Sequence, residues 1–219
     1  MNHHKKIVLS ALALMLFFVN ANCQTKMPEG KIEYSITNIF SNRKQPIDTF
    51  NKYTNVFLFK DKKQRTDEFL NGFISRKSYY DGNDPTTLTM VNSNNKVYEE
   101  VEYTYKDFDP AKVCPKKNFI HLKEEKTISG YKCRKATYSL QGDTTILYVY
   151  YSKEVTAPLA FDLIYTFSNL DGYPMEYDIN YSDKKVIYTV TKIKMEKVDD
   201  IVFVIPKTNK SSNKDDKHK

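Results

Sequence analysis

Few side chains of this sequence have the types and spacing that catalysis or metal binding requires. Beyond the first 23 residues the chain holds only two histidines, so a histidine-based site would depend on His121, because His218 lies at the extreme C-terminus. Glu100 and Glu102 share one face of a predicted strand, at a spacing that a glycosidase pair could use. An ordinary strand histidine and a solvated acidic face are the commoner interpretations. The chain has none of the usual metalloprotease, serine-hydrolase, phosphate-loop or Cys-x-x-Cys motifs. We therefore predict no catalytic residue, no metal site, no cofactor and no enzymatic activity.

Aromatic residues are the better candidates for a binding site. The sequence has 17 Tyr and 13 Phe but no Trp, and residues 146–151 and 186–195 are apolar on both faces of their predicted strands. Strands of this kind are covered on both sides, in a curved sheet either by helices or by a ligand. Core packing with hydroxyl groups at the rim is an equally weighted alternative. The predicted lining of an apolar ligand cavity is Tyr148, Tyr150, Phe161, Leu163, Tyr177, Tyr181 and Tyr188.

The start of the chain predicts where such a site would work. Lys5 and Lys6 precede an apolar run over residues 7–19, and small and polar residues follow up to residue 23. This layout is typical of a secretory signal peptide, and the run is too short for a membrane-spanning helix. We therefore expect residues 1–23 to be removed, leaving an exported bacterial protein, periplasmic or extracellular, with no transmembrane segment.

The processing site has two interpretations. Cleavage between Cys23 and Gln24 fits a plain signal peptide, and this is the expectation we prefer. Cleavage before Cys23, with lipid then attached to it, would make an outer-membrane lipoprotein. That signal prefers small and aliphatic residues where this chain has Asn22 and Asn20, so lipidation is the less favoured alternative.

Export also bears on the other two cysteines. The chain has three cysteines in all, and Cys114 and Cys133 are the pair that remains in the mature protein. In an oxidising compartment such a pair most simply forms a disulfide, worth about 3 kcal/mol if it is unstrained. Two unpaired buried thiols are the alternative.

Charge and composition limit the classes of partner. The net charge is +7, but the basic residues are scattered rather than gathered with aromatic residues into a stripe that would bind nucleic acid.

Residues 24–206 are expected to form a single β-rich domain. Residues 207–219 are rich in Lys, Asn, Ser and Asp, and we predict a disordered basic tail because they lack the apolar content to pack.

Alternating apolar and polar residues define the elements that must position these side chains. The pattern predicts a mainly β protein: a curved antiparallel sheet of about ten strands forming an incomplete β-barrel. Short helices are expected at 109–113 and 157–167, packed against the sheet. The expected strands are 31–37, 55–59, 64–70, 73–80, 86–91, 96–105, 119–122, 131–140, 144–151, 175–182, 186–195 and 201–205.

Several short segments together resemble a family of exported bacterial proteins of unknown function, related to the GLPGLI-type proteins and similar in pattern to the lipoprotein carriers LolA and LolB. The most specific is Gly130-Tyr131-Lys132-Cys133. The resemblance implies an incomplete antiparallel barrel with a hydrophobic hollow, and no catalytic residue. The other matching segments are 30–34, 60–65, 96–98, 128–136, 172–175 and 203–206.

Two functions are consistent with these expectations. The first is a non-enzymatic extracytoplasmic protein that binds a lipid or another apolar molecule in the hollow of the sheet. The second is a cell-envelope interaction module with a fully packed core, which would bind a protein partner through a surface rich in Lys and Tyr. The presence or absence of a cavity is the feature that separates them.

Overall fold

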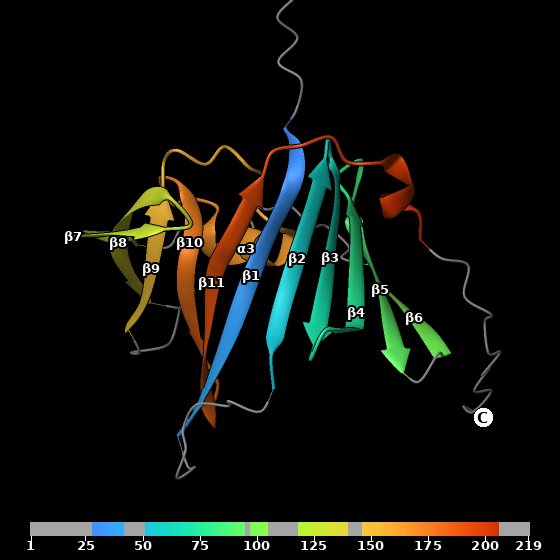
Figure 1. Cartoon of the computed structure of the whole chain (residues 1–219), viewed down its shortest axis with the longest axis horizontal. Helices are drawn as coiled ribbons and strands as arrows, with labels where there is room; N and C mark the ends of the chain where they lie inside the picture. Colours follow the sequence, from blue (N-terminus) through green and yellow to red (C-terminus); the bar gives the residue numbers. More distant parts are fainter. Residues whose placement is uncertain (1–27, 42–50, 95–96, 105–117, 140–145, 206–219) are drawn as a thin grey trace, which may run out of the picture.

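The computed structural model describes residues 28–41, 51–94, 97–104, 118–139 and 146–205. Within these residues the chain forms one antiparallel sheet of eleven strands (Figure 1). The strands are β1 (Glu29–Phe40), β2 (Tyr53–Lys60), β3 (Lys63–Leu70), β4 (Phe73–Asp81), β5 (Asp84–Asn94), β6 (Val97–Thr104), β7 (Ile120–Ile128), β8 (Tyr131–Ser139), β9 (Ile146–Ser152), β10 (Tyr173–Asn180) and β11 (Lys184–Lys194).

The strand order makes this an open, curled sheet. Strands β1 to β6 pair in chain order, and so do strands β7 to β11, but β6 does not pair with β7. In addition β1 pairs with β11, from Lys31 opposite Lys194 to Phe40 opposite Lys184. The two edges of the sheet are therefore β6 and β7, which lie in the middle of the sequence. The predicted fold class, a mainly β protein with a curved antiparallel sheet, is confirmed.

Local irregularities accompany the curvature. The register shifts between Glu33 and Tyr34 in β1 and between Pro174 and Glu176 in β10, and such bulges increase strand twist and bend. Gly30 allows β1 and β11 to approach closely, because a Cβ at this position would overlap the carbonyl oxygen of Lys194.

The concave face of the sheet carries the core. Ile32 and Tyr34 of β1 are buried there beside Phe57 and Phe59 of β2, whose rings stack with their centroids 5.3 Å apart. Buried residues of β8, β9 and β10 continue this cluster on the other side of β1 and β11. The sheet thus curls around a single apolar core.

The helix α3 (Phe161–Phe167) packs on this concave face, behind the sheet as drawn in Figure 1. Seven residues are too few to form a stable helix alone, so tertiary packing must hold it. Leu163 and Phe167 are both buried in the core. The predicted helix over 157–167 is present, but it begins only at Phe161 because Ala160 keeps an extended conformation, with φ −59° and ψ 149°.

The C-terminal segment differs from its prediction. The strand expected at 201–205 is wrong: the structure has a 3-10 helix, η1 (Asp200–Phe203), instead. The side chain of Asp199 accepts a hydrogen bond from the backbone N–H of Ile201 and so caps the turn. Arg65 of β3 donates to the carbonyl oxygen of Val202 at 2.8 Å, which ties η1 to the convex face of the sheet.

Several predicted features lie outside the described residues: the signal peptide over 1–23, the helix over 109–113, Cys114 and the tail over 207–219. They stay predictions. Of the helices that the structure describes, none has the length and apolar character needed to cross a bilayer.

Candidate functional site

Two adjoining cavities lie between α3 and the concave face of the sheet. The larger has a volume of about 290 Å³ and the smaller about 120 Å³. Glu68, Arg76 and Asp162 line both, so the two cavities meet at these three residues. We call the combined space the hollow.

The larger cavity has an aromatic wall formed by β8 to β11 and α3. Tyr177 and Tyr188 are cross-strand partners whose rings stack with centroids 4.9 Å apart and only 7° between their planes. Tyr181, which is 52% exposed, stands at the mouth of the cavity. The aromatic wall consists of Tyr138, Leu147, Leu163, Thr166, Phe167, Tyr177, Ile179, Tyr181 and Tyr188.

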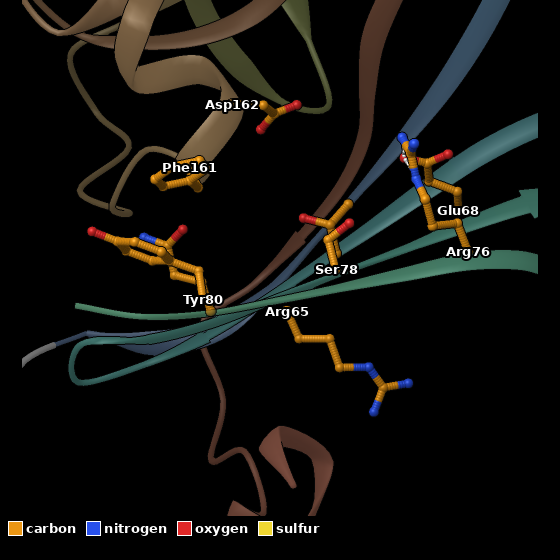
Figure 2. A pocket seen from close by; sticks show the side chains of 9 residues that line it. Arg65, Glu68, Arg76, Ser78, Tyr80, Phe161 and Asp162 are labelled. Carbon is orange, nitrogen blue, oxygen red and sulfur yellow. Dashed lines mark hydrogen bonds and ion pairs between the residues drawn. The ribbon is translucent and has the colours of Figure 1, made fainter. Parts of the chain in front are cut away.

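A polar wall faces it, formed by neighbouring positions of β2, β3 and β4. Asn55 is opposite Glu68, and Glu68 is opposite Arg76. On the same face of β3 and β4, Thr66 is opposite Ser78 two residues further along, and Gln64 is opposite Tyr80 four residues further along. Figure 2 shows the side chains of Glu68, Arg76, Ser78 and Tyr80 on the side of the sheet that faces α3, whereas Arg65 projects from the opposite side. The polar wall consists of Asn55, Gln64, Thr66, Glu68, Arg76, Ser78 and Tyr80.

Arg76 and Glu68 form an ion pair within the polar wall. The Nε of Arg76 donates to Oε1 of Glu68 at 2.9 Å, and its Nη2 donates to the same oxygen. Both side chains are partly exposed, so we expect little contribution to stability. The pair does, however, offset the charge of Arg76 inside the hollow.

Asp162 projects from the first turn of α3 toward the hollow (Figure 2). The residue is exposed, but the protein atoms packed around its carboxyl group remove part of the hydration of that group, and this desolvation raises its pKa. The negative charge of Glu68 acts in the same direction, and Arg76 acts against it. Across the described part of the chain, no cationic side chain forms a salt bridge with Asp162.

Gln64 adds a fixed acceptor group to the smaller cavity. Its Nε2 donates to the carbonyl oxygen of Leu159 at 3.0 Å, which fixes the orientation of the amide. Its Oε1 is buried and has no hydrogen-bond partner among the residues that the structure describes. Buried acceptors are usually paired, so this oxygen lacks a donor.

Five of the seven residues predicted from the sequence to line a cavity surround the hollow. Leu163, Tyr177, Tyr181 and Tyr188 line the larger cavity. Phe161 lines the smaller one, with its ring centroid 4.5 Å from that of Tyr80.

The structure does not bring Tyr148 and Tyr150 to the hollow. Leu147 lines the larger cavity, and because side chains alternate along β9, these two tyrosines project from the opposite, convex face. The hydroxyl group of Tyr150 donates to Glu124, and the ammonium group of Lys126 lies 4.0 Å from the centre of its ring. Burial raises the pKa of Tyr148 to about 12.

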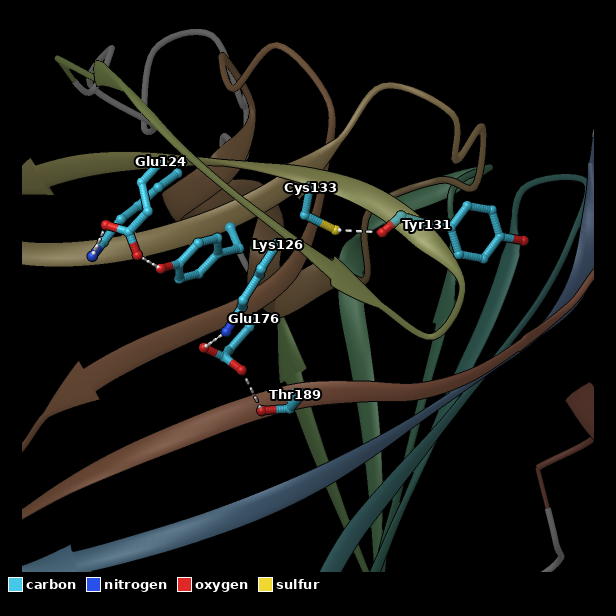
Figure 3. A network of polar contacts seen from close by, with 8 residues as sticks. Glu124, Lys126, Tyr131, Cys133, Glu176 and Thr189 are labelled. Atoms are coloured by element: carbon cyan, nitrogen blue, oxygen red, sulfur yellow. Dashed lines mark hydrogen bonds and ion pairs between the residues drawn. The ribbon is translucent and has the colours of Figure 1, made fainter.

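The convex face thus carries a network of its own (Figure 3). Lys126 reaches from β7 to Glu176 of β10 at 2.6 Å, and Glu176 accepts a hydrogen bond from Thr189 of β11 at 3.1 Å. Lys135 pairs with Glu124 at 2.9 Å. The Lys126–Glu176 and Tyr150–Glu124 contacts hold β7 against β10 and β9, whereas the Lys135–Glu124 pair joins the two strands of the β7–β8 hairpin.

The remaining chemical candidates lie apart from the hollow. Cys133 is buried and its thiol donates to the carbonyl oxygen of Tyr131 at 3.3 Å (Figure 3). Its disulfide with Cys114 stays a prediction, because Cys114 lies outside the described residues. His121 is exposed, with Nδ1 2.9 Å from the hydroxyl oxygen of Tyr151. In the described ranges no three His, Cys, Asp or Glu residues form a group that could hold a metal ion.

The three residues at the junction of the cavities were not among the sequence predictions. Glu68, Arg76 and Asp162 are ordinary charged residues in the sequence. The hairpin turn at Asn71-Gly72 indicates that β3 and β4 pair, but it does not show which face of the hairpin is covered.

Comparison with known proteins gives distant likenesses only. No family model matches the chain, and no curated protein matches it. Two crystal forms of PNGF-II are similar to it, with TM-scores of 0.43, sequence identities of 16% and 15%, and coverage of 80% of this chain. The chain spans about 30% of the length of PNGF-II.

A LolA superfamily protein, NE2245 from Nitrosomonas europaea, is also similar, with a TM-score of 0.38 and 8% identity. The likeness covers 82% of this chain and 91% of that protein. Membership of the GLPGLI-related family stays a prediction.

Proposed function

We propose that this protein is an exported, non-enzymatic binding protein that holds a small amphipathic molecule in the hollow. The observation that carries the proposal is the cavity of about 290 Å³ between an aromatic wall and a polar wall. Ligand sites are typically concave, with apolar side chains supplying most of the contact and a few polar groups fixing the orientation. Export rests on the signal-peptide pattern over residues 1–23.

The size of the hollow limits the ligand. A volume of about 290 Å³ is just below the range of roughly 300–1,000 Å³ for ligand pockets, and equals the share of about ten liquid water molecules. One short alkyl chain or one ring system fits this space. A complete two-chain phospholipid does not, because α3 with Leu163 and Phe167 occupies the middle of the concave face.

The polar wall indicates that the ligand has a polar group as well as the apolar part expected from the sequence. Glu68, Arg76 and Asp162 stand where the cavities meet, so a bound molecule that fills both spaces would touch them. Burying an apolar group against these charges would cost free energy because they would lose hydration. A ligand with a polar end placed there and an apolar end against the tyrosines avoids this cost.

Calorimetric titration with n-octanol tests the proposal. We expect saturable binding to the wild-type protein, with a negative heat-capacity change from apolar burial. Thr166→Trp on α3 would fill the larger cavity and should abolish binding. Phe73→Trp, at a side chain that is 79% exposed, is the matched control and should bind as the wild type does. Equal binding by both variants, or no binding by the wild type, would rule out the hollow as the site.

The convex face favours a second candidate, an envelope interaction module. Tyr148 is half-buried there and is flanked by Lys135 and Lys185, whereas Tyr150 is buried beneath Lys126. Tyrosine is enriched at protein interfaces. If this face binds a partner, cross-linking in intact cells should yield a product that Tyr148→Ala removes and Thr166→Trp leaves. The reverse pattern would favour the hollow.

A further inference from the structure

Two carboxylate groups and one guanidinium group stand where the two cavities of the hollow meet, and a buried acceptor oxygen of Gln64 has no donor among the described residues. We infer that the hollow selects a ligand whose polar end is a protonated amine, joined to an apolar chain or ring. This inference rests on the proposed function and specifies the ligand class for the same site.

The charge count is the first support. Glu68, Arg76 and Asp162 line both cavities, so two carboxylate groups face one guanidinium group. Arg76 directs two of its N–H groups at Oε1 of Glu68. Asp162 has no salt bridge to a Lys or Arg within the described ranges; backbone N–H groups of Asp162 and Leu163 at the start of α3 face its carboxyl group, and Arg76 acts on it from a distance. A cationic ligand would supply the missing counter-charge.

Hydrogen-bonding capacity is the second, independent support. The Oε1 of Gln64 is buried without a partner in the described structure, and its amide cannot simply rotate because Nε2 already donates to Leu159. Gln64 lines the smaller cavity together with Asp162. An ammonium group carries three donors and no acceptor, so it complements a wall of this composition. A carboxylate, which only accepts, does not.

The aromatic wall can contribute as well. Tyr177 and Tyr188 stack in the larger cavity, and tyrosine rings attract cations at their faces. At the mouth, however, the ammonium group of Lys184 already lies 5.6 Å from the ring centre of Tyr181 and would repel a second cation. The ammonium group of the ligand therefore belongs at the junction beside Asp162, with the apolar part of the ligand along the tyrosines.

Titration with three molecules of the same chain length tests the inference: octylamine, n-octanol and octanoate at pH 7. Octylamine is protonated at this pH. A hydrogen bond to a charged group is worth more than one between neutral groups, so octylamine should bind at least roughly tenfold more tightly than octanol. Octanoate should bind most weakly, because it would have to displace Glu68 from Arg76.

A matched pair of variants locates the preference. Asp162→Asn removes the charge but retains a side chain of the same shape, and it should reduce octylamine binding to the level of octanol binding. Asp171→Asn changes an exposed aspartate that pairs with Lys153 outside the hollow, and it should leave the preference intact. Circular dichroism of both variants checks that they fold.

The outcomes separate this inference from the proposed function. If all three molecules bind the wild-type protein equally, or if octanoate binds best, the amine inference is overturned while binding in the hollow stands. If none of them binds, both fail. A tenfold preference that persists in Asp162→Asn would also overturn the inference, because the charge would then act elsewhere.

Discussion

Phe167→Ala tests how strongly α3 is attached to the concave face of the sheet. Phe167 is the last residue of the helix and is 1% exposed. Its ring meets those of Tyr177 and Tyr138 edge-on, with centroids 5.1 Å and 5.6 Å away, and that of Phe119 at 6.3 Å. Because the helix is too short to be stable alone, much of its attachment to the sheet depends on this ring.

The expected loss follows from the burial. Replacing a fully buried phenylalanine by alanine costs about 3–5 kcal/mol, the sum of lost apolar transfer and the cavity left behind. For a domain of this size, such a loss lowers the melting temperature by roughly 6–20 °C. The same change enlarges the larger cavity, which Phe167 lines, so decanol should gain affinity relative to octanol.

Circular dichroism during urea and thermal unfolding measures the stability, because the chain has no tryptophan to report by fluorescence. Phe73→Ala, at an exposed side chain, is the control and should change the free energy of unfolding by no more than about 0.5 kcal/mol. A loss below about 1 kcal/mol in Phe167→Ala would show that α3 does not pack against the sheet as described. A large loss with no change in the preference between decanol and octanol would separate the helix from the binding site.

Three further outcomes are expected. Gly30→Ala should destabilise the protein more than Gly72→Ala when urea unfolding of the two is compared, because the Cβ at residue 30 would lie 2.4 Å from the carbonyl oxygen of Lys194, whereas the Cβ at residue 72 meets nothing within 4 Å and Gly72→Ala carries only the strain of a φ of +84°; a smaller loss in Gly30→Ala would contradict the close approach of β1 to β11. Burial raises the pKa of Tyr148 to about 12 and raises the pKa values of the buried tyrosines of the core. Their neutral forms therefore contribute full stability below the unfolded pKa of about 10, and this stability is lost as the pH rises through the folded values. Circular dichroism should then show unfolding above about pH 10 together with tyrosinate absorbance, and ionisation without unfolding would count against the burial. Finally, mass spectrometry of the denatured, unreduced mature protein after alkylation should find Cys133 unmodified, because it is paired in the predicted disulfide; an alkylated Cys133 would exclude the bridge.

Much of the strand content could be predicted because alternation is a local property. Residues 31–37 alternate cleanly and form the middle of β1, and the Asn71-Gly72 turn correctly joins β3 to β4. The pairing of β1 with β11 is not local, and nothing in either strand alone specifies its partner. That pairing places β1 and β11 in the middle of the sheet, and β6 and β7 become its two edges because they do not pair with each other.

The candidate site was harder to predict for a specific physical reason. Counting back from the Asn71-Gly72 turn places Glu68 opposite Ser75. The register shifts between Glu68 and Phe69, and this brings Arg76 opposite Glu68 instead. A shift of one residue turns a whole strand segment to the other face, so the polar wall could not be assembled from the pattern alone.

The side of the sheet on which Tyr148 lies could not be predicted from the sequence either. Its strand is apolar on both faces, so alternation separates the residues of β9 into two sets without showing which set faces inward. The structure places Leu147 in the hollow and Tyr148 on the convex face, beside Lys135 and Lys185. Deciding between the faces requires knowing where α3 packs, which is tertiary information.

Photo-cross-linking with an octylamine that carries a diazirine on its alkyl chain tests the central claim, a ligand in the hollow, most directly. Peptide mapping of the irradiated protein should place the label within α3 and within residues 177–188, the segments that form the aromatic wall. Excess octylamine should suppress the labelling, and so should the cavity-filling Thr166→Trp. Label confined to the convex face around Tyr148 and Tyr150, or labelling unaffected by Thr166→Trp, would contradict the account.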